Sequence, residues 1–242
     1  DLVYGLNELY HNNGDLTFTD ITKQTGTAAA YSWAVTFCDY DNDGDPDIFA
    51  ANDQGLAKEG QVCPIMLFRN DGNLKFTDVT RAAGFTASGS WMGLAFGDYD
   101  HDGDLDLFAT NLGTSVQFDQ QDTDFHALYR NNGDGTFTNV AEEMGLARWE
   151  FGWGTAFIDF DNDGDIDVVI LNSRREPTLL RNDSPRGNHW LRVRLRGSRS
   201  NRDGIGARIK VVAGGLTLID EVHSGRGYQS HFGMHPHFGL GS

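Results

Sequence analysis

The most constraining feature of the sequence is a repeat of about 60 residues that occurs three times. One block of the repeat has Asn-Gly or Asp-Gly at its centre: LYHNNGDLTFTDIT from Leu9, LFRNDGNLKFTDVT from Leu67 and LYRNNGDGTFTNVA from Leu128. A block rich in aspartate follows each of these: AVTFCDYDNDGDPDIFAAN from Ala34, GLAFGDYDHDGDLDLFATN from Gly93 and GTAFIDFDNDGDIDVVILN from Gly154. Self-similarity at a fixed period indicates a repeat architecture.

Each copy of the repeat is predicted to form four β-strands. Asn-Gly and Asp-Gly turns tolerate positive φ and are typical of a hairpin, which accounts for two strands. The apolar stretches before and after the Asp-rich run account for the other two. A four-stranded unit in tandem is typical of a β-propeller blade, whereas the repeats of a β-solenoid are usually shorter. We therefore predict an all-β fold with propeller blades of about 60 residues.

The number of blades leads to a further expectation. A propeller closes with about four to eight blades, but three Asp-rich runs are present. The opening residues, Asp1-Leu2-Val3, match those that end the runs, such as Asp47-Ile48-Phe49. This match predicts that the chain begins at the last aspartate of a fourth run and is a fragment, unless blades of another chain complete the ring.

Each Asp-rich run has the pattern D-x-D-x-D-G-D-x-D, and we number its positions 1 to 9. Five carboxylates so close together repel one another unless a cation lies among them. Calcium takes about 6–8 oxygen ligands, whereas magnesium demands stricter octahedral geometry and ranks second. We predict about three calcium sites, with side-chain oxygens from positions 1, 3, 5 and 9 and the carbonyl of position 7. The candidate metal residues are Asp39, Asp41, Asp43, Asp45, Asp47, Asp98, Asp100, Asp102, Asp104, Asp106, Asp159, Asp161, Asp163, Asp165 and Asp167.

The runs differ from an EF-hand loop in how they end. An EF-hand has a bidentate glutamate at position 12, where this chain has Ala50, Ala109 or Ile170. The ion is therefore expected to brace a β-hairpin rather than two helices. A reading as solvated Asp-Gly turns without an ion is the alternative, and three copies with identical Asp positions disfavour it.

The repeats resemble the FG-GAP/VCBS repeats of integrin-type β-propellers over roughly residues 1–182. The remainder is similar to the ASPIC/UnbV domain that follows such repeats in the cartilage acidic protein family. The matching motifs are NHWL from Asn188, SNRDGIGAR from Ser200, GRGYQS from Gly225 and HFGLG from His237.

This resemblance implies two units, 1–182 as propeller repeats and 183–242 as an ASPIC/UnbV-like domain. Because family members usually continue beyond the FGLG stretch, the second unit is expected to be truncated. The resemblance also implies calcium binding and an extracellular interaction with no agreed ligand.

The charge distribution changes sign along the chain. Residues 1–173 contain 30 acidic and 7 basic residues, a net of −23, whereas residues 174–242 contain 5 acidic and 12 basic residues, a net of +7. Such a change usually marks a domain boundary, and the acidic part would repel nucleic acid. The basic part could fit a polyanion, but Arg192, Arg194 and Arg196 alternate along one predicted strand and are expected simply to face water.

Other features bear on location and partners. No apolar run approaches the length of a membrane span. Together with the resemblance, this predicts a secreted or cell-surface protein. Cys38 and Cys63 could form one disulfide in that compartment or remain as thiols.

The function that we expect is a calcium-binding adhesion or interaction module without catalysis, whose partner is a protein or a glycan. The alternatives are a structural subunit that self-assembles into a fibre, or a carbohydrate-active enzyme on a propeller scaffold. An enzyme would need a deep pocket with acids or histidines that are not metal ligands. Trp33, Trp91 and Trp153 could stack on sugars, but packing between blades is favoured. Similarly, His235-Pro236-His237 could bind a transition metal, but a surface loop is favoured.

Overall fold

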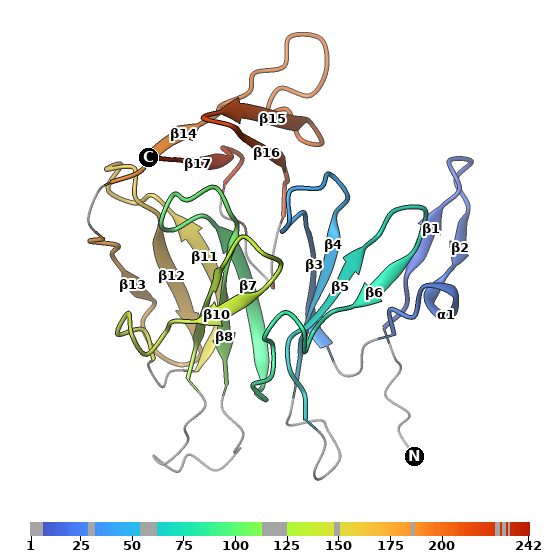
Figure 1. Ribbon diagram of the computed structural model, residues 1–242, viewed down its shortest axis with the longest axis horizontal. Coiled ribbons are helices and arrows are strands. Elements are labelled where there is room, and N and C mark those ends of the chain that lie inside the picture. Colours follow the sequence, from blue (N-terminus) through green and yellow to red (C-terminus); the bar gives the residue numbers. More distant parts are fainter. Residues whose placement is uncertain are drawn as a thin grey trace.

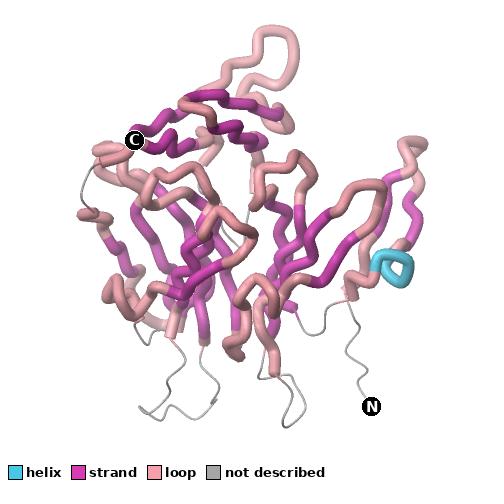
Figure 2. The backbone as a smooth tube through the Cα atoms, in the orientation of Figure 1, coloured by secondary structure: helices cyan, strands magenta, loops and turns pink. Residues whose placement is uncertain are grey.

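The computed structural model describes residues 7–28, 32–53, 62–112, 125–147, 151–184, 187–225, 228, 231 and 233–242. In these residues the chain consists of short strands joined by turns, with one short helix, α1 (Thr22–Thr25) (Figure 2). The predicted all-β fold is confirmed.

Two sheets are complete four-stranded antiparallel meanders. The first contains β3 (Ser32–Cys38), β4 (Asp47–Asn52), β5 (Met66–Asn70) and β6 (Phe76–Asp78), in that order. The second repeats this arrangement with β7 (Trp91–Gly97), β8 (Asp106–Asn111), β9 (Ala127–Asn131) and β10 (Phe137–Asn139). Both have the form of propeller blades (Figure 1).

Two further sheets contain part of the same pattern. A three-stranded sheet is formed by β11 (Gly152–Ile158), β12 (Asp167–Asn172) and β13 (Thr178–Leu180). A hairpin of β1 (Tyr10–Asn12) and β2 (Phe18–Asp20) lies beside the first sheet, where Leu9 packs against Ile48, Ala50 and Phe68. The residues before Asn7, including the opening that we matched to a fourth Asp-rich run, lie outside the described residues.

The hairpins of the first and second sheets pair with the Asp-rich strands that precede them. Ile48 pairs with Phe68, and Leu107 pairs with Tyr129. Our sequence unit grouped each hairpin with the Asp-rich block that follows it, and that grouping is wrong. A period of about 60 residues is the same wherever the repeat is cut, so periodicity alone cannot locate the end of a sheet.

The core lies between neighbouring sheets. Phe49 and Leu67 of the first sheet pack against Leu94 and Phe96 of the second. On its other face the second sheet packs Phe108 and Leu128 against Phe157 and Val168 of the third. Because it has a neighbour on both faces, every residue of β7 and β8 is buried.

Four strands near the C-terminus form two small sheets. β14 (His189–Arg192) pairs with β17 (His237–Gly241), and β15 (Arg208–Ala213) pairs with β16 (Leu216–Glu221). We call the described residues from 188 to 242 the C-terminal unit. It lies across one end of the three sheets (Figure 1). The division of the chain at residues 182 and 183 stays a prediction.

The structure bears on two further predictions, which concern the strand with three arginines and the two cysteines. The predicted strand that carries three arginines ends at Arg192, so Arg194 and Arg196 do not continue it. Cys38 and Cys63 are both buried, and no disulfide joins them.

Candidate metal centres

Each Asp-rich run forms the turn between two antiparallel strands. We call these turns the first (39–47), second (98–106) and third (159–167) Asp loops. Position 4 has a φ of 56° at Asn42, 59° at His101 and 60° at Asn162. Position 6 is a glycine with a φ near 100° in all three loops. Glycine adopts such angles without a steric penalty, so the three loops share one backbone path.

The aspartate at position 9 fastens each loop to the neighbouring strand. In the first loop, Asp47 accepts hydrogen bonds from the backbone N–H of Tyr40 at 3.2 Å and from that of Asn70 at 2.8 Å. Asp106 and Asp167 make the same pair of bonds, with donors Tyr99, Asn131, Phe160 and Asn182. Position 9 is thus held by the fold itself.

Shorter-range bonds orient the other carboxylates. Asp39 at position 1 accepts the N–H of Gly44 at 3.0 Å, and Asp98 accepts that of Gly103 at 2.9 Å. Position 5 accepts the N–H of position 7 in every loop, at 2.8 to 3.0 Å. The bond to Asp39 uses one oxygen of its carboxylate, whereas both oxygens of Asp98 accept, Oδ1 from the N–H of Asp102 at 3.0 Å and Oδ2 from that of Gly103.

Three carboxylates converge in each loop, with one oxygen from each lying within 4.8 Å of the others. Positions 1 and 3 belong to all three groups. The third member is position 5 in the first loop and position 9 in the other two. The groups are Asp39, Asp41 and Asp43; Asp98, Asp100 and Asp106; and Asp159, Asp161 and Asp167.

The carboxylates at position 7 belong to none of these groups, in agreement with a position expected to offer its carbonyl. A side chain at Gly133 would come within 2.7 Å of the Asp104 carboxylate, which therefore lies over the next hairpin turn. Asp165 lies 4.0 Å from His101 of the second loop. Asp45 at position 7 and Asp102 and Asp163 at position 5 are also predicted ligands that lie outside the three groups.

Each loop contains one buried carboxylate oxygen without a hydrogen-bond partner in the described part of the chain. These atoms are Oδ1 of Asp39, Asp100 and Asp159. Burying a charged oxygen without a partner is costly. A hard cation with oxygen ligands would remove that cost, so the residues present fit calcium.

Burial also raises the pKa values of these carboxyls. The pKa of Asp39 rises to about 6 and that of Asp98 to about 8, first because of burial and then because of neighbouring aspartates. Burial raises the pKa of Asp47 to about 8 and that of Asp106 well above its ordinary value. A bound cation would favour the ionised forms and reverse these shifts.

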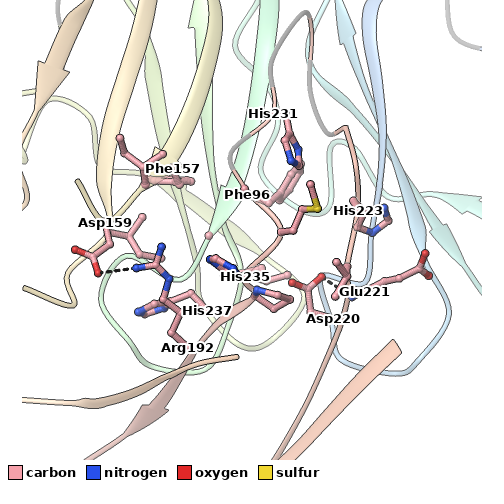
Figure 3. A pocket seen from close by; sticks show the side chains of 18 residues that line it. Phe96, Phe157, Asp159, Arg192, Asp220, Glu221, His223, His231, His235 and His237 are labelled. Carbon is pink, nitrogen blue, oxygen red and sulfur yellow. Dashed lines mark hydrogen bonds and ion pairs between the residues drawn. The ribbon is translucent and has the colours of Figure 1, made fainter. Parts of the chain in front are cut away.

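A cavity of about 140 Å³ lies between the inner strands and the C-terminal unit (Figure 3). Phe96 and Phe157 line it from the sheets, and His235 and His237 line it from the C-terminal unit. At its edge the Arg192 guanidinium lies 3.4 Å from Oδ2 of Asp159. The alternating arginine pattern missed this contact, because nothing in the local sequence shows which residues lie opposite.

The other sequence candidates are placed as follows. No histidine joins a group of three potential metal ligands within the described ranges. Trp91 is buried in the core, as expected for packing between blades. Trp33 on β3 and Trp153 on β11 also pack against each other between two sheets, with ring centroids 6.5 Å apart. Both rings contact Tyr228 of the C-terminal unit as well, with centroids 6.2 and 6.0 Å away.

No helix in the part of the chain that the structure describes is long and apolar enough to cross a membrane.

Two family models match different parts of the chain. The FG-GAP-like repeat model matches residues 2–50, 42–109 and 120–170, and the ASPIC and UnbV model matches residues 197–242. Cartilage acidic protein 1 is 27% identical in Homo sapiens and 28% identical in Mus musculus, over 98% of this chain in both cases. The chain spans 35% and 36% of the length of these relatives.

The solved structures similar to this chain include one that covers most of it. It is an Agrocybe aegerita lectin described as recognising non-reducing terminal N-acetylglucosamine, with 18% identity over 94% of this chain and 69% of the lectin. Its TM-score of 0.37 is too low to indicate a shared fold or a shared ligand. The family models, by contrast, match more than half of the chain, and the chain therefore belongs to the FG-GAP-like repeat family, with an ASPIC and UnbV segment at its C-terminal end.

Proposed function

We propose that the chain is a calcium-binding interaction module without catalytic activity that works outside the cell, secreted or at the cell surface. The observation that carries the proposal is the threefold repeat of one loop geometry, in which three carboxylates converge around a buried oxygen without a partner. A turn that served only to reverse the chain would not need this group three times.

The donor set favours calcium over other metals. Every candidate ligand is an oxygen, and no cysteine or histidine lies within the three groups. Zinc and copper sites usually use nitrogen or sulfur ligands. Magnesium keeps several waters and binds through one or two carboxylates, so a loop with five aspartates suits calcium better.

The extracellular role rests on the relatives. Proteins named cartilage acidic protein match nearly the whole chain, and the repeat part of this chain is itself strongly acidic. We expect the partner to be a protein or a glycan that binds to the exposed surface of the repeats, and self-assembly into a larger structure is the alternative.

The rival function is a carbohydrate-active enzyme, which would need a pocket with uncommitted acids or histidines. The cavity of about 140 Å³ is lined by acids and histidines, including Asp220 and His235, but Asp220 accepts the backbone N–H of Glu221 at 2.8 Å. It is smaller than the roughly 300–1,000 Å³ of typical ligand pockets, and its Asp159 is paired with Arg192. These two features disfavour catalysis in this cavity.

Calcium titration of chelator-treated protein by calorimetry tests the proposal. We expect about three calcium ions per chain, and weaker binding of magnesium. The variants Asp41→Asn, Asp100→Asn and Asp161→Asn should each lose one site, whereas the exposed control Asp183→Asn should keep all three. Absence of binding at millimolar calcium would contradict the proposal, as would variants that bind the full number of ions.

A further inference from the structure

The C-terminal unit rests on the turn of all three Asp loops. The glycine at position 6 is the point of contact in each. A Cβ atom at Gly44 would lie 2.9 Å from Arg208, and one at Gly103 would lie 3.1 Å from Leu216. Gly164 lies directly against the Trp190 ring. The three loops together therefore form the surface on which the C-terminal unit is seated.

The hydrogen bonds across this interface end on main-chain carbonyls of the loops. In the second loop, the Asn188 side chain donates to the carbonyl of Asp100 at 2.9 Å, and the Gly241 N–H donates to that of His101 at 2.9 Å. In the third loop, His237 Nε2 lies 3.0 Å from the Gly164 carbonyl, and in the first loop Arg208 donates to the Gly44 carbonyl. The backbone path of each loop fixes the positions of these oxygens.

The interface also reaches the candidate metal ligands themselves. Arg192 contacts Oδ2 of Asp159, while Oδ1 of the same carboxylate is buried without a partner. In the second loop, Gly239 of β17 packs directly against Oδ2 of Asp98. Asp98 and Asp159, both at position 1, thus each contact the C-terminal unit through Oδ2. The buried Oδ1 of Asp159 remains available for a cation.

We propose that calcium in the Asp loops and docking of the C-terminal unit stabilise each other, so that removal of calcium releases the unit from the sheets. This inference rests on the proposed calcium binding. Without a cation, the crowded carboxylates repel one another and displace the loop carbonyls that the C-terminal unit binds. Linkage is reciprocal, so loss of docking must weaken calcium binding by the same factor.

A purely electrostatic interface would behave in the opposite way. Residues 1–173 have a net charge of −23 and residues 174–242 a net charge of +7, so the two parts attract each other. Removing calcium takes two positive charges from each loop and would leave that attraction unchanged or strengthen it. The direction of the calcium effect therefore distinguishes recognition of loop shape from attraction between charges.

Hydrogen–deuterium exchange of the whole chain, with calcium and with chelator, measures docking directly. Peptides that cover β17 report the Gly241 amide at the interface, and peptides that cover β15 and β16 report pairing within the unit. We expect exchange in β17 to become roughly 5- to 150-fold faster after chelation, with a smaller change in β15 and β16. Unchanged or slower exchange in β17, in a protein shown to have lost its calcium, would overturn the inference.

A glycine variant tests the reciprocal direction. Gly239→Ala places a methyl group against Asp98 and against the His101 backbone, whereas the matched control Gly187→Ala places one in open space. Because this methyl group also pushes on the second loop directly, Arg208→Ala, which inserts nothing into a loop, must lower calcium affinity in the same direction. We expect calcium affinity to fall roughly fivefold or more in Gly239→Ala and to stay unchanged in the control. Arg208→Ala, which removes only a side-chain contact, provides the same test if Gly239→Ala does not fold.

The outcomes separate the two proposals. If the unmodified chain binds no calcium, the proposed function fails. If it binds calcium but Gly239→Ala exchanges rapidly in β17 with unchanged calcium affinity, only the coupling fails.

Discussion

The second and third sheets contain the same sequence pattern in different surroundings. Leu128 on β9 and Leu179 on β13 are equivalent, since each lies three residues before the asparagine that donates to position 9. Leu128 is 2% exposed and Leu179 is 46% exposed. The second sheet has a packed neighbour on both faces, whereas the described residues cover the third sheet on one face. The burial of a repeat position is therefore determined by the neighbouring sheet rather than by the repeat itself.

The Asp loops differ in the same way. Position 1 is buried at Asp98 and partly buried at Asp159, and position 3 is partly buried at Asp100 and exposed at Asp161, whereas position 9 is buried in both loops. Burial is the main reason that the pKa of Asp98 rises to about 8 and that of Asp106 rises well above its ordinary value. We expect the second loop to depend on a cation more strongly than the third, although both have the same nine-residue pattern.

The largest effect of a single substitution is expected at position 9 of the second loop. Asp106→Ala leaves the buried N–H groups of Tyr99 and Asn131 without an acceptor and weakens the calcium site. Two unsatisfied donors would lower the free energy of unfolding by roughly 2–6 kcal/mol, measured by denaturant in the presence of calcium. Asp167→Ala should cost less, and the exposed control Asp183→Ala should have little effect. Equal losses at Asp106 and Asp167 would contradict the contrast between the two sheets.

The equivalent leucines provide a second test. Leu128→Ala removes side-chain packing between two sheets and should lower the free energy of unfolding by about 2–5 kcal/mol. Leu179→Ala should lower it by less than about 1 kcal/mol, since the side chain is largely exposed. If denaturant unfolding gives similar losses for both variants, another surface covers Leu179 in solution.

The third loop is expected to show a smaller effect that depends on calcium. Asp161→Ala removes one predicted ligand from an exposed position. With calcium at 100 times its Kd, losing one site would lower the free energy of unfolding by about 2.7 kcal/mol at most. Thermal unfolding should show this loss relative to Asp183→Ala in calcium, and little difference between the variants in chelator. A difference that persists in chelator would show that Asp161 acts without the metal.

The pH dependence of the metal-free protein gives the smallest effect when it is counted for one carboxyl and one pH unit. The pKa values of Asp47 and Asp98 are about 8 in the folded chain, against an ordinary value of 3.8. Between pH 4 and 8 the folded form therefore retains protons that the unfolded form has released. Stability should fall as the pH rises, by up to about 1.4 kcal/mol per pH unit for each retained proton. Unfolding midpoints in chelator at pH 5 and pH 8 check this direction, and calcium should remove the decrease.

Much of the repeat part could be predicted from the sequence. Asn-Gly and Asp-Gly turns, the apolar stretches on either side of each Asp-rich run and the fixed Asp spacing are local signals, and they led to the hairpins and the three loops. The grouping of strands into sheets was wrong because pairing of Ile48 with Phe68 depends on which strands are neighbours in space. The sequence correctly placed Asp41 near Asp39, and Asp161 near Asp159, because the two members of each pair lie in one short turn.

The contacts of the C-terminal unit could not be predicted in the same way. Arg192 was expected to face water but lies 3.4 Å from Asp159, and Asn188 reaches Asp100 across 88 residues of sequence. Such contacts join unlike elements without periodicity, so a single sequence contains no pattern that indicates them. The unequal burial of Leu128 and Leu179 is hidden for the same reason.

Thermal unfolding of the intact chain with calcium and with chelator tests the central claim most directly. Three sites at about 2.7 kcal/mol each would stabilise the folded chain by about 8 kcal/mol when calcium is 100 times its Kd. At about 2–4 °C per kcal/mol, the midpoint should fall by roughly 15–30 °C when calcium is removed. An unchanged midpoint, in protein shown to have lost its calcium, would mean that the Asp loops are turns without a structural ion and that the sheets are held by their cores alone.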